Sequence, residues 1–341
     1  MKRTVRGLVL LSGGLDSTLA AKLLQEQGID ILGIKFTSPF CLCDSGGKCH
    51  ALEVAKNMKI PLKVISKGEE YLEIIRNPKY GYGSALNPCV DCRIHMLKKA
   101  KELMKKSIAD FIVTGEVLGQ RPMSQHKKTL LLIEREAGLE GKVLRPLSAK
   151  LLPKTEPEIR GFVDREKLLD IKGRSRKRQL ALIKQLNITG WGAPSGGCLL
   201  TQKEFAAKLK DLFKWKPKII WRDVELLKIG RHFRAENSKI IVGRNEQENK
   251  LLLGLKNEDD YWLEVPNYGS PVVLLQGTKK EELLIELAAS ITARYSDCKH
   301  DNVLVKCNTG LKEYTIKVKP AEQSTIEKLR IVYGKHSNSS R

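Results

Sequence analysis

The chain has 341 residues, too many for one ordinary hydrophobic core, so two or three domains are expected. It carries 61 Lys and Arg against 39 Asp and Glu, a formal net charge of +22 that favours a polyanionic partner such as nucleic acid, with a general enrichment in lysine as the alternative. No apolar run reaches the length of a membrane span, and we therefore expect a cytoplasmic protein without a membrane partner.

The first 150 residues alternate between strand and helix patterns. Apolar runs of strand length alternate with runs whose apolar residues recur at helical spacing. Strands are predicted at 5–11, 30–36, 61–66 and 109–115, and helices at 16–28, 51–60 and 89–106. This alternation predicts an α/β domain at 1–150, with a parallel sheet and helices on both of its faces.

The rest of the chain changes character twice. Residues 151–217 are rich in Pro, Gly and Arg and end in a predicted connecting helix. From 218 to 341, short strand patterns alternate with turns, and one clear helix is predicted at 280–296. We interpret 151–217 as a basic extension and 218–341 as a separate, smaller α+β domain.

The stretch "LVLLSGGLDST" at 8–18 predicts a phosphate site. Gly13 and Gly14 allow the backbone to approach a phosphate closely. The helix that follows offers unpaired N–H groups and a positive dipole end, while Ser12 and Ser17 add hydroxyl donors. Asp16 is expected to orient the loop or to meet Mg²⁺. The alternative is a plain strand-to-helix turn with Asp16 as its cap.

The full Ser-Gly-Gly-x-Asp-Ser string resembles the pyrophosphate loop of the PP-loop ATP pyrophosphatases, which split ATP into AMP and pyrophosphate. It is not a Walker A loop, because no Gly-Lys-Ser/Thr follows. The resemblance implies an adenine nucleotide alpha hydrolase-like fold, with ATP and Mg²⁺ bound across 8–18 and 31–36. The nucleotide-binding residues that it implies are Ser12, Gly13, Gly14, Asp16, Ser17, Lys35, Phe36 and Gly115.

The eight cysteines include a pair, Cys89 and Cys92, that is spaced by one helical turn in "NPCVDCRI". Both sulfur atoms can therefore face one point. The position at the start of a predicted helix is expected to lower the thiol pKa. A disulfide, a metal site and a sulfur-carrying site are all compatible with this stretch alone, although clustered cysteines in the cytosol more often serve metals or catalysis.

Four segments resemble the tRNA 2-thiouridine synthases. "NPCVDCRI" matches their Asn-Pro-x-x-x-Cys segment, and "FIVTGE" at 111–116 is similar to their Thr-Gly-His strand end, with Glu116 in place of histidine. The stretch at 143–160 resembles their lysine-bearing segment, and "PSGGCLL" at 194–200 falls where they place a second cysteine. The catalytic residues that the resemblance implies are Cys89, Cys198 and Asp16.

The tRNA thiolases that bind an iron–sulfur cluster also use a Cys-x-x-Cys and one distant cysteine. By this resemblance, Cys89, Cys92 and Cys198 are expected to hold a [4Fe-4S] cluster with one open iron. A persulfide passed between two thiols is the second interpretation, and a zinc site with His95 as fourth ligand is the third. A separate group, Cys41, Cys43, Cys49 and His50, has no standard zinc spacing and is interpreted as a reduced loop.

Basic segments near the predicted site favour contacts with RNA phosphates. The residues expected to make them are Arg121, Arg174, Arg176, Lys177 and Arg178. Residues 222–332 resemble the RNA-binding domain of the NFACT ribosome-quality-control proteins, which implies RNA contacts at Arg244 and Asn249, with Glu264 departing from a frequent histidine. The alternative is a small scaffold domain that binds no RNA.

Together these features predict an enzyme that thiolates a tRNA uridine at the expense of ATP, with a cysteine desulfurase relay or free sulfide as sulfur donor. The base would leave its stack, its carbonyl oxygen would be adenylated, and sulfur would displace AMP. A PP-loop amide or carbon–nitrogen ligase and a non-catalytic RNA-binding adaptor are the alternatives. The cysteine set and the basic C-terminal domain argue against the ligase, and the intact loop argues against the adaptor.

Overall fold

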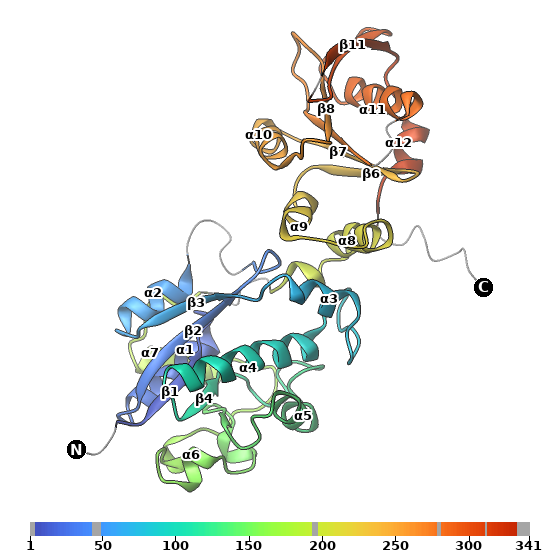
Figure 1. The fold of residues 1–341 in the computed structure, drawn as a ribbon. Coiled ribbons are helices and arrows are strands. Elements are labelled where there is room, and N and C mark those ends of the chain that lie inside the picture. Colours follow the sequence, from blue (N-terminus) through green and yellow to red (C-terminus); the bar gives the residue numbers. More distant parts are fainter. Residues whose placement is uncertain (1–3, 43–48, 193–196, 278–280, 311, 333–341) are drawn as a thin grey trace. The chain divides into compact units, whose positions relative to one another are not determined.

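The structure is a computed structural model that describes residues 4–42, 49–192, 197–277, 281–310 and 312–332 (Figure 1). The chain divides into two compact units, Met1–Thr201 and Gln202–Arg341. The sequence instead suggested boundaries at 150 and 217. The structure joins 151–201 to the first unit because one of its helices packs on the first helix of the chain. Within the described ranges, no helix has the length and apolar character to cross a bilayer.

The first unit is a five-stranded parallel sheet with the strand order β3-β2-β1-β4-β5. Its strands are β1 (Arg6–Leu10), β2 (Asp30–Thr37), β3 (Leu62–Ser66), β4 (Phe111–Thr114) and β5 (Val143–Leu144). Its α-helices are α1 (Leu15–Gln25), α2 (His50–Asn57), α3 (Glu70–Arg76), α4 (Cys89–Lys106), α5 (Lys127–Ala137), α6 (Glu156–Ile159) and α7 (Lys177–Gln185). Single 3₁₀ turns lie at Ala149–Leu151, Arg165–Lys167 and Leu199–Thr201. The predicted α/β fold is confirmed.

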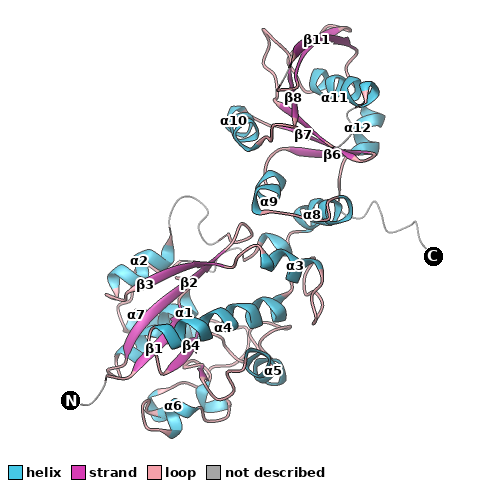
Figure 2. Cartoon of the chain, viewed as in Figure 1, coloured by secondary structure: helices cyan, strands magenta, loops and turns pink. Residues whose placement is uncertain are grey.

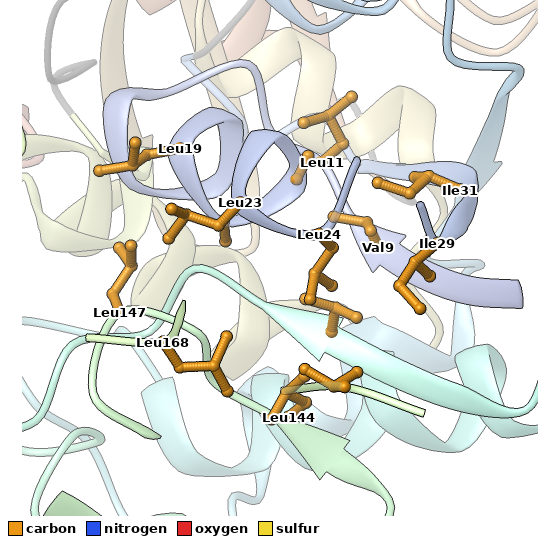
Figure 3. Close-up of a cluster of buried hydrophobic side chains, with 14 of the residues drawn as sticks. Val9, Leu11, Leu19, Leu23, Leu24, Ile29, Ile31, Leu144, Leu147 and Leu168 are labelled. Atoms are coloured by element: carbon orange, nitrogen blue, oxygen red, sulfur yellow. The ribbon is translucent and has the colours of Figure 1, made fainter. Parts of the chain in front are cut away.

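Strand β1 lies in the middle of this sheet and is buried on both faces. Val9 and Leu11 pack with apolar residues of α1 and α2, as Figure 3 shows for α1. Leu8 and Leu10 point to the other face and pack with residues of α4 and α5. Alternating side chains of one strand therefore serve two cores, which is why the strand reads as a continuous apolar run.

The strand order places a crevice at the carboxyl end of β1. The chain passes from β1 to β2 on one side, whereas β4 lies on the other side of β1. In open α/β sheets, ligands bind where the strand order switches in this way. The loop after β1 and the residues that follow β4 therefore meet at the expected binding position.

The second unit is a six-stranded antiparallel sheet with the order β11-β10-β8-β9-β7-β6. Figure 2 colours the strands magenta and the helices cyan. Its strands are β6 (Arg231–Ala235), β7 (Ser238–Val242), β8 (Tyr261–Glu264), β9 (Val273–Gln276), β10 (Val303–Asn308) and β11 (Glu313–Val318). Its helices are α8 (Lys203–Trp215), α9 (Trp221–Leu227), α10 (Glu246–Leu255), α11 (Glu282–Arg294) and α12 (Gln323–Leu329). One apolar cluster joins the sheet to α11 and α12, and another joins it to α9 and α10. The predicted smaller α+β domain is confirmed.

Candidate functional site: a nucleotide pocket beside a cluster of thiols

A pocket of about 1000 Å³, counted out to its open mouth, lies at the carboxyl ends of β1, β2 and β4. The residues predicted to bind nucleotide line this pocket, with the exception of Gly13. The lining also contains three arginines, Arg93, Arg121 and Arg176. The pocket therefore combines a glycine loop, a helix N-terminus and clustered positive charge, which together suit a polyphosphate.

Side-chain hydroxyls hold the phosphate loop in shape. The Oγ atoms of Ser12 and Ser17 lie 3.0 Å apart, and Ser17 Oγ donates to the carbonyl of Gly14 at 3.1 Å. The amides of Ser12 and Gly14 donate to these hydroxyls at 3.2 and 3.4 Å. Helix α1 begins at Leu15 without a side-chain cap, so its first turn presents backbone N–H groups to a ligand.

Two glycines of this region are required by close backbone contacts. Gly13 has a φ of 77°, and a Cβ there would lie 2.3 Å from the amide nitrogen of Ala51. A Cβ on Gly115 would lie 2.5 Å from the amide nitrogen of Ser17. The end of β4 therefore rests directly on the first turn of α1. Gly13 does not line the pocket, and it acts by allowing the loop to pack on the start of α2.

Asp16 occupies the first turn of α1 and lines the pocket. Burial raises the pKa of its carboxyl group, and hydrogen bonds from Gln120 and Gln179 oppose that rise in part. Gln179 Nε2 lies 3.3 Å from Asp16 Oδ1. Gln179 belongs to α7, so the basic extension supplies a direct partner to the phosphate loop.

A second contact ties the extension to the loop. The amide of Gly192 donates to the carbonyl of Gly13 at 2.9 Å. Arg176, at the N-cap of α7, reaches the pocket. Arg178 pairs with Asp170 at 2.7 Å on the exposed side. The other two basic residues predicted on this segment, Arg174 and Lys177, are exposed.

A buried charge network supports one wall of the pocket. Glu116, which stands where the resemblance expected histidine, accepts a hydrogen bond from Arg145 Nε at 3.1 Å. Arg145 also pairs with Glu134 through Nη1, and Arg93 Nε lies 3.5 Å from Glu116 Oε1. Sequence reasoning missed the partners Arg93, Arg145 and Glu134, because they lie on α4, after β5 and on α5, which only the folded sheet brings together.

A cluster of thiols lies at the start of α4. Cys89 and Cys92 occupy the first turns of this helix, as predicted, and both are half-buried. Lys67, which follows β3 and is buried, donates from Nζ to Cys92 Sγ at 3.2 Å. Burial lowers the pKa of Lys67, but the neighbouring thiol groups of Cys92, Cys41 and Cys198 raise it more. Lys67 is therefore hydrogen-bonded to the thiol of Cys92 and lies in the neighbourhood of Cys41 and Cys198.

Cys198 reaches this cluster through backbone pairing. The amide of Leu86 donates to the carbonyl of Leu200 at 3.0 Å, beside the start of α4. Cys198 itself forms an antiparallel bridge with Cys41. Cys92 and Cys41 are both electrostatic neighbours of Cys198, although the sequence interpreted Cys41 as part of a separate loop.

Burial raises the pKa of two of these thiols, and at Cys89 it outweighs the helix N-terminus. The sequence led us to expect lowered thiol pKa values, yet burial raises the pKa of Cys89, although Arg93 and Arg121 oppose the rise. Burial likewise raises the pKa of Cys198 to about 12. The expectation was wrong for Cys89, because desolvation disfavours the thiolate, and the same desolvation acts on Cys198, for which the sequence led to no expectation.

The residues that the structure describes do not include a group of three or more His, Cys, Asp or Glu side chains that could hold a metal ion. In this arrangement Cys89, Cys92 and Cys198 do not form a cage for a [4Fe-4S] cluster, which stays a prediction. His95 bonds the carbonyl of Lys67 through Nε2 at 2.7 Å, so that nitrogen is not available as a zinc ligand. Cys43 lies outside the described residues, and Cys49 accepts a hydrogen bond from Lys35 at 2.9 Å.

In the second unit, the two residues predicted to bind RNA differ in exposure. Arg244 is exposed and pairs with Glu248 one helical turn later. Asn249 uses both ends of its amide inside the unit: it donates to the carbonyl of Ser270 at 3.2 Å and accepts from the amide of Val272 at 2.9 Å. Asn249 therefore shapes the loop before β9, and Arg244 has the more accessible group.

Comparison with known families identifies the two kinds of domain. A family model described as "Thiamine biosynthesis protein (ThiI)" matches residues 3–151, and one described as "NFACT protein RNA binding domain" matches residues 230–330. Residues 3–151 are thus similar to the ThiI family, and residues 230–330 are similar to NFACT-type RNA-binding domains. Both resemblances predicted from the sequence are confirmed.

Individual relatives cover only parts of the chain. A tRNA-specific 2-thiouridylase, MnmA, of Geobacter metallireducens is 34% identical over 135 residues, which are 33% of this chain and 36% of the relative, so the chain spans about a third of that curated protein. A 4-thiouridine synthetase–RNA complex with bound ATP has a TM-score of 0.35 and 20% identity, over 54% of this chain and 50% of that one. The U34-tRNA thiolase NcsA of Methanococcus maripaludis with its [4Fe-4S] cluster has a TM-score of 0.34 and 18% identity, over 67% of this chain and 73% of that one.

Proposed function

We propose that this chain is an ATP-dependent sulfurtransferase that thiolates a uridine of tRNA. The observation that carries the proposal is the presence, in one compact unit, of a phosphate loop at the switch point of the sheet and a group of thiols around Lys67. The matching families and the thiouridylase relative support the same chemistry.

In this proposal the pocket binds ATP with its phosphates at the start of α1 and its adenine near Phe36 at the end of β2. Arg121 and Arg176 balance the phosphate charge, and Asp16 is the loop carboxylate that would meet the accompanying Mg²⁺. The carbonyl oxygen of an unstacked uridine attacks the α-phosphorus, and pyrophosphate leaves. The base then carries AMP as a leaving group.

In this proposal the sulfur transfer is carried by the thiols themselves. A persulfide on one of them, which we place on Cys198, attacks the activated carbon through its outer sulfur. The bond from carbon to the AMP oxygen breaks, and AMP leaves with the electron pair. A second thiol must then release the product from the enzyme sulfur.

The second unit supplies RNA affinity in this proposal. Its NFACT-type fold and the exposed Arg244 suit sequence-independent contacts with phosphates. Arg174 and Lys177 offer further exposed positive charge on the first unit. RNA contacts by these residues are expected to weaken together as salt rises.

The decisive experiment incubates the full chain with ATP, Mg²⁺, polysulfide as the donor of persulfide sulfur and unmodified tRNA, and follows thiolated nucleosides by mass spectrometry together with pyrophosphate. Both products should require ATP and tRNA. Pyrophosphate release that depends on a small amine or carboxylate, without any thiolated nucleoside, would instead indicate the ligase. Iron and sulfide analysis after anaerobic purification tests for the iron–sulfur cluster. Iron bound to the wild type that decreases in each of Cys89→Ser, Cys92→Ser and Cys198→Ser would favour the cluster over the persulfide mechanism.

A further inference from the structure

Two cysteines from distant parts of the first unit lie directly opposite each other. Cys41 and Cys198 form an isolated antiparallel bridge. The amide of Leu42 donates to the carbonyl of Gly197 at 3.4 Å, and the amide of Leu199 donates to the carbonyl of Phe40 at 2.9 Å. These hydrogen bonds flank the cysteines on both sides, which defines Cys41 and Cys198 as a non-hydrogen-bonded pair.

This register brings the Cα atoms of the two cysteines to a spacing that a disulfide can span. Opposed residues at a non-hydrogen-bonded position have Cα atoms about 4.5 Å apart, and their side chains leave the bridge on the same face. A disulfide needs Cα atoms about 4.4–6.8 Å apart. The backbone around Cys41 and Cys198 therefore needs no large movement to form one, and both residues are half-buried rather than sealed in the core.

We propose that Cys41 is the resolving thiol of the sulfur site and forms a reversible disulfide with Cys198. The inference rests on the proposed function and deepens it, because it names the thiol that releases the product. Cys41 is outside the three cysteines that the sequence analysis assigned to the site, and the bridge is the observation that adds it.

The step balances with the groups present. After the persulfide of Cys198 has attacked the base, the outer sulfur is bonded to both the base carbon and Cys198 Sγ. Cys41, having lost its proton to water, attacks Cys198 Sγ. The bond between Cys198 Sγ and the outer sulfur breaks, and its electron pair stays on the outer sulfur, which remains on the base as the thiocarbonyl. An external dithiol reductant then returns the Cys41–Cys198 disulfide to two thiols and is itself oxidised to a disulfide.

Cys92 is the competing partner for Cys198, and the structure gives it a different environment. It lies on helix α4 rather than on the bridge, and its Sγ accepts a hydrogen bond from Lys67 at 3.2 Å. Cys41 Sγ instead lies 3.4 Å from the hydroxyl of Ser38 and opposite Cys198. The bridge therefore favours Cys41 as the thiol that closes the disulfide.

The first test maps disulfides in the full chain without any RNA. The protein is oxidised with diamide, its free thiols are alkylated, and its peptides are analysed without reduction. A linked Cys41–Cys198 peptide is expected in the wild type and in Cys92→Ser, the matched control, and its loss is expected in Cys41→Ser. A Cys92–Cys198 link in the wild type, with Cys41 fully alkylated, would overturn the proposal.

The second test measures the resolving step itself. Protein loaded with persulfide by polysulfide should release sulfide and gain the disulfide, whereas Cys41→Ser and Cys41→Ala should keep the persulfide. Melting temperatures near that of the wild type confirm that these variants fold. Release of sulfide by both variants at the wild-type rate would reject the role of Cys41. If the Cys41–Cys198 disulfide forms but the protein thiolates no tRNA, the proposed sulfurtransferase activity is wrong, whereas the pairing of the two cysteines is correct.

Discussion

Replacing Arg145 with methionine tests whether the buried charge network holds the wall of the nucleotide pocket. The side chain of Arg145 is 3% exposed and lies between the carboxylates of Glu116 and Glu134, which are 4% and 5% exposed. Methionine fills similar space but carries no charge. The variant therefore leaves two buried carboxylates without the guanidinium group that joins them.

Breaking a buried ion pair from one side costs about 3–5 kcal/mol, because the remaining charge stays buried. For a unit of this size, such a loss lowers the melting temperature by roughly 10 °C. The matched control is Arg178→Met, which removes an arginine–carboxylate pair of 2.7 Å whose side chains are 57% and 54% exposed. Arg178→Met should lower the unfolding free energy by less than about 1 kcal/mol.

The pH dependence of the unfolding free energy should differ between the wild type and Arg145→Met in a defined direction. Burial raises the pKa of Glu116, but the guanidinium groups of Arg145 and Arg93 lower it more, so the net pKa lies below the usual value. The wild type therefore has the full stabilisation from Glu116 near neutral pH and loses it as the pH falls through that lowered pKa. In Arg145→Met the carboxyl group of Glu116 takes up a proton at higher pH, and the difference in unfolding free energy between variant and wild type should narrow as the pH falls from 7 towards 4.

Hydrogen exchange at the amides of β4 measures the unfolding free energy of this unit separately from that of the second. The reasoning would be refuted if Arg145→Met lowered the unfolding free energy no more than Arg178→Met does. It would also be refuted if the difference in unfolding free energy between Arg145→Met and the wild type did not change with pH. Binding of a fluorescent ATP analogue should weaken in Arg145→Met, because Glu116 lines the pocket.

Four further outcomes are expected. Asp16→Asn should slow pyrophosphate release far more than it lowers the melting temperature, and unchanged ATP turnover would remove the loop from the mechanism. Gly115→Ala should weaken ATP binding, because its Cβ would lie 2.5 Å from the amide nitrogen of Ser17, and calorimetry showing wild-type affinity would contradict this. Deleting 202–341 should weaken RNA binding and flatten its salt dependence, and an unchanged salt slope in filter binding would give that unit another role. Burial lowers the pKa of Lys239 to about 7, so between pH 7 and about 10 the unfolded chain binds one more proton than the folded chain, and the unfolding free energy of the second unit should rise with pH. Urea titrations of Lys239→Met should show no such rise. A rise that persists in this variant would mean that another group causes it.

The sequence was sufficient where one continuous segment carries both the pattern and its function. The phosphate loop follows directly from β1, and α4 matches the predicted helix at 89–106 from end to end. Helix α7 was missed, because the basic run at 173–179 conceals the start of a helix whose buried side includes Gln179 and Ile183. The charged residues on the exposed face of α7 obscured the helical spacing of the residues on its buried face.

The parts of the site that were missed are assembled across the sheet. Lys67 follows β3 and reads as an ordinary surface lysine, yet parallel pairing places it beside α4 and Cys92. Cys41 was grouped with its sequence neighbour Cys49, whereas a backbone bridge pairs it with Cys198, more than 150 residues away. Such contacts depend on strand register, which local patterns do not specify.

The contact between Gly13 and the start of α2 has a mechanical consequence. Side chains absorb small displacements by changing rotamer, but here backbone rests on backbone, with no room for a Cβ between Gly13 and Ala51. A shift of the loop is therefore passed directly to His50 and Ala51. Helix α2 begins immediately after Cys49, whose sulfur bonds to Lys35 at the nucleotide pocket. A residue larger than glycine at position 13 must therefore displace the start of α2, and with it Cys49, the N-cap of that helix.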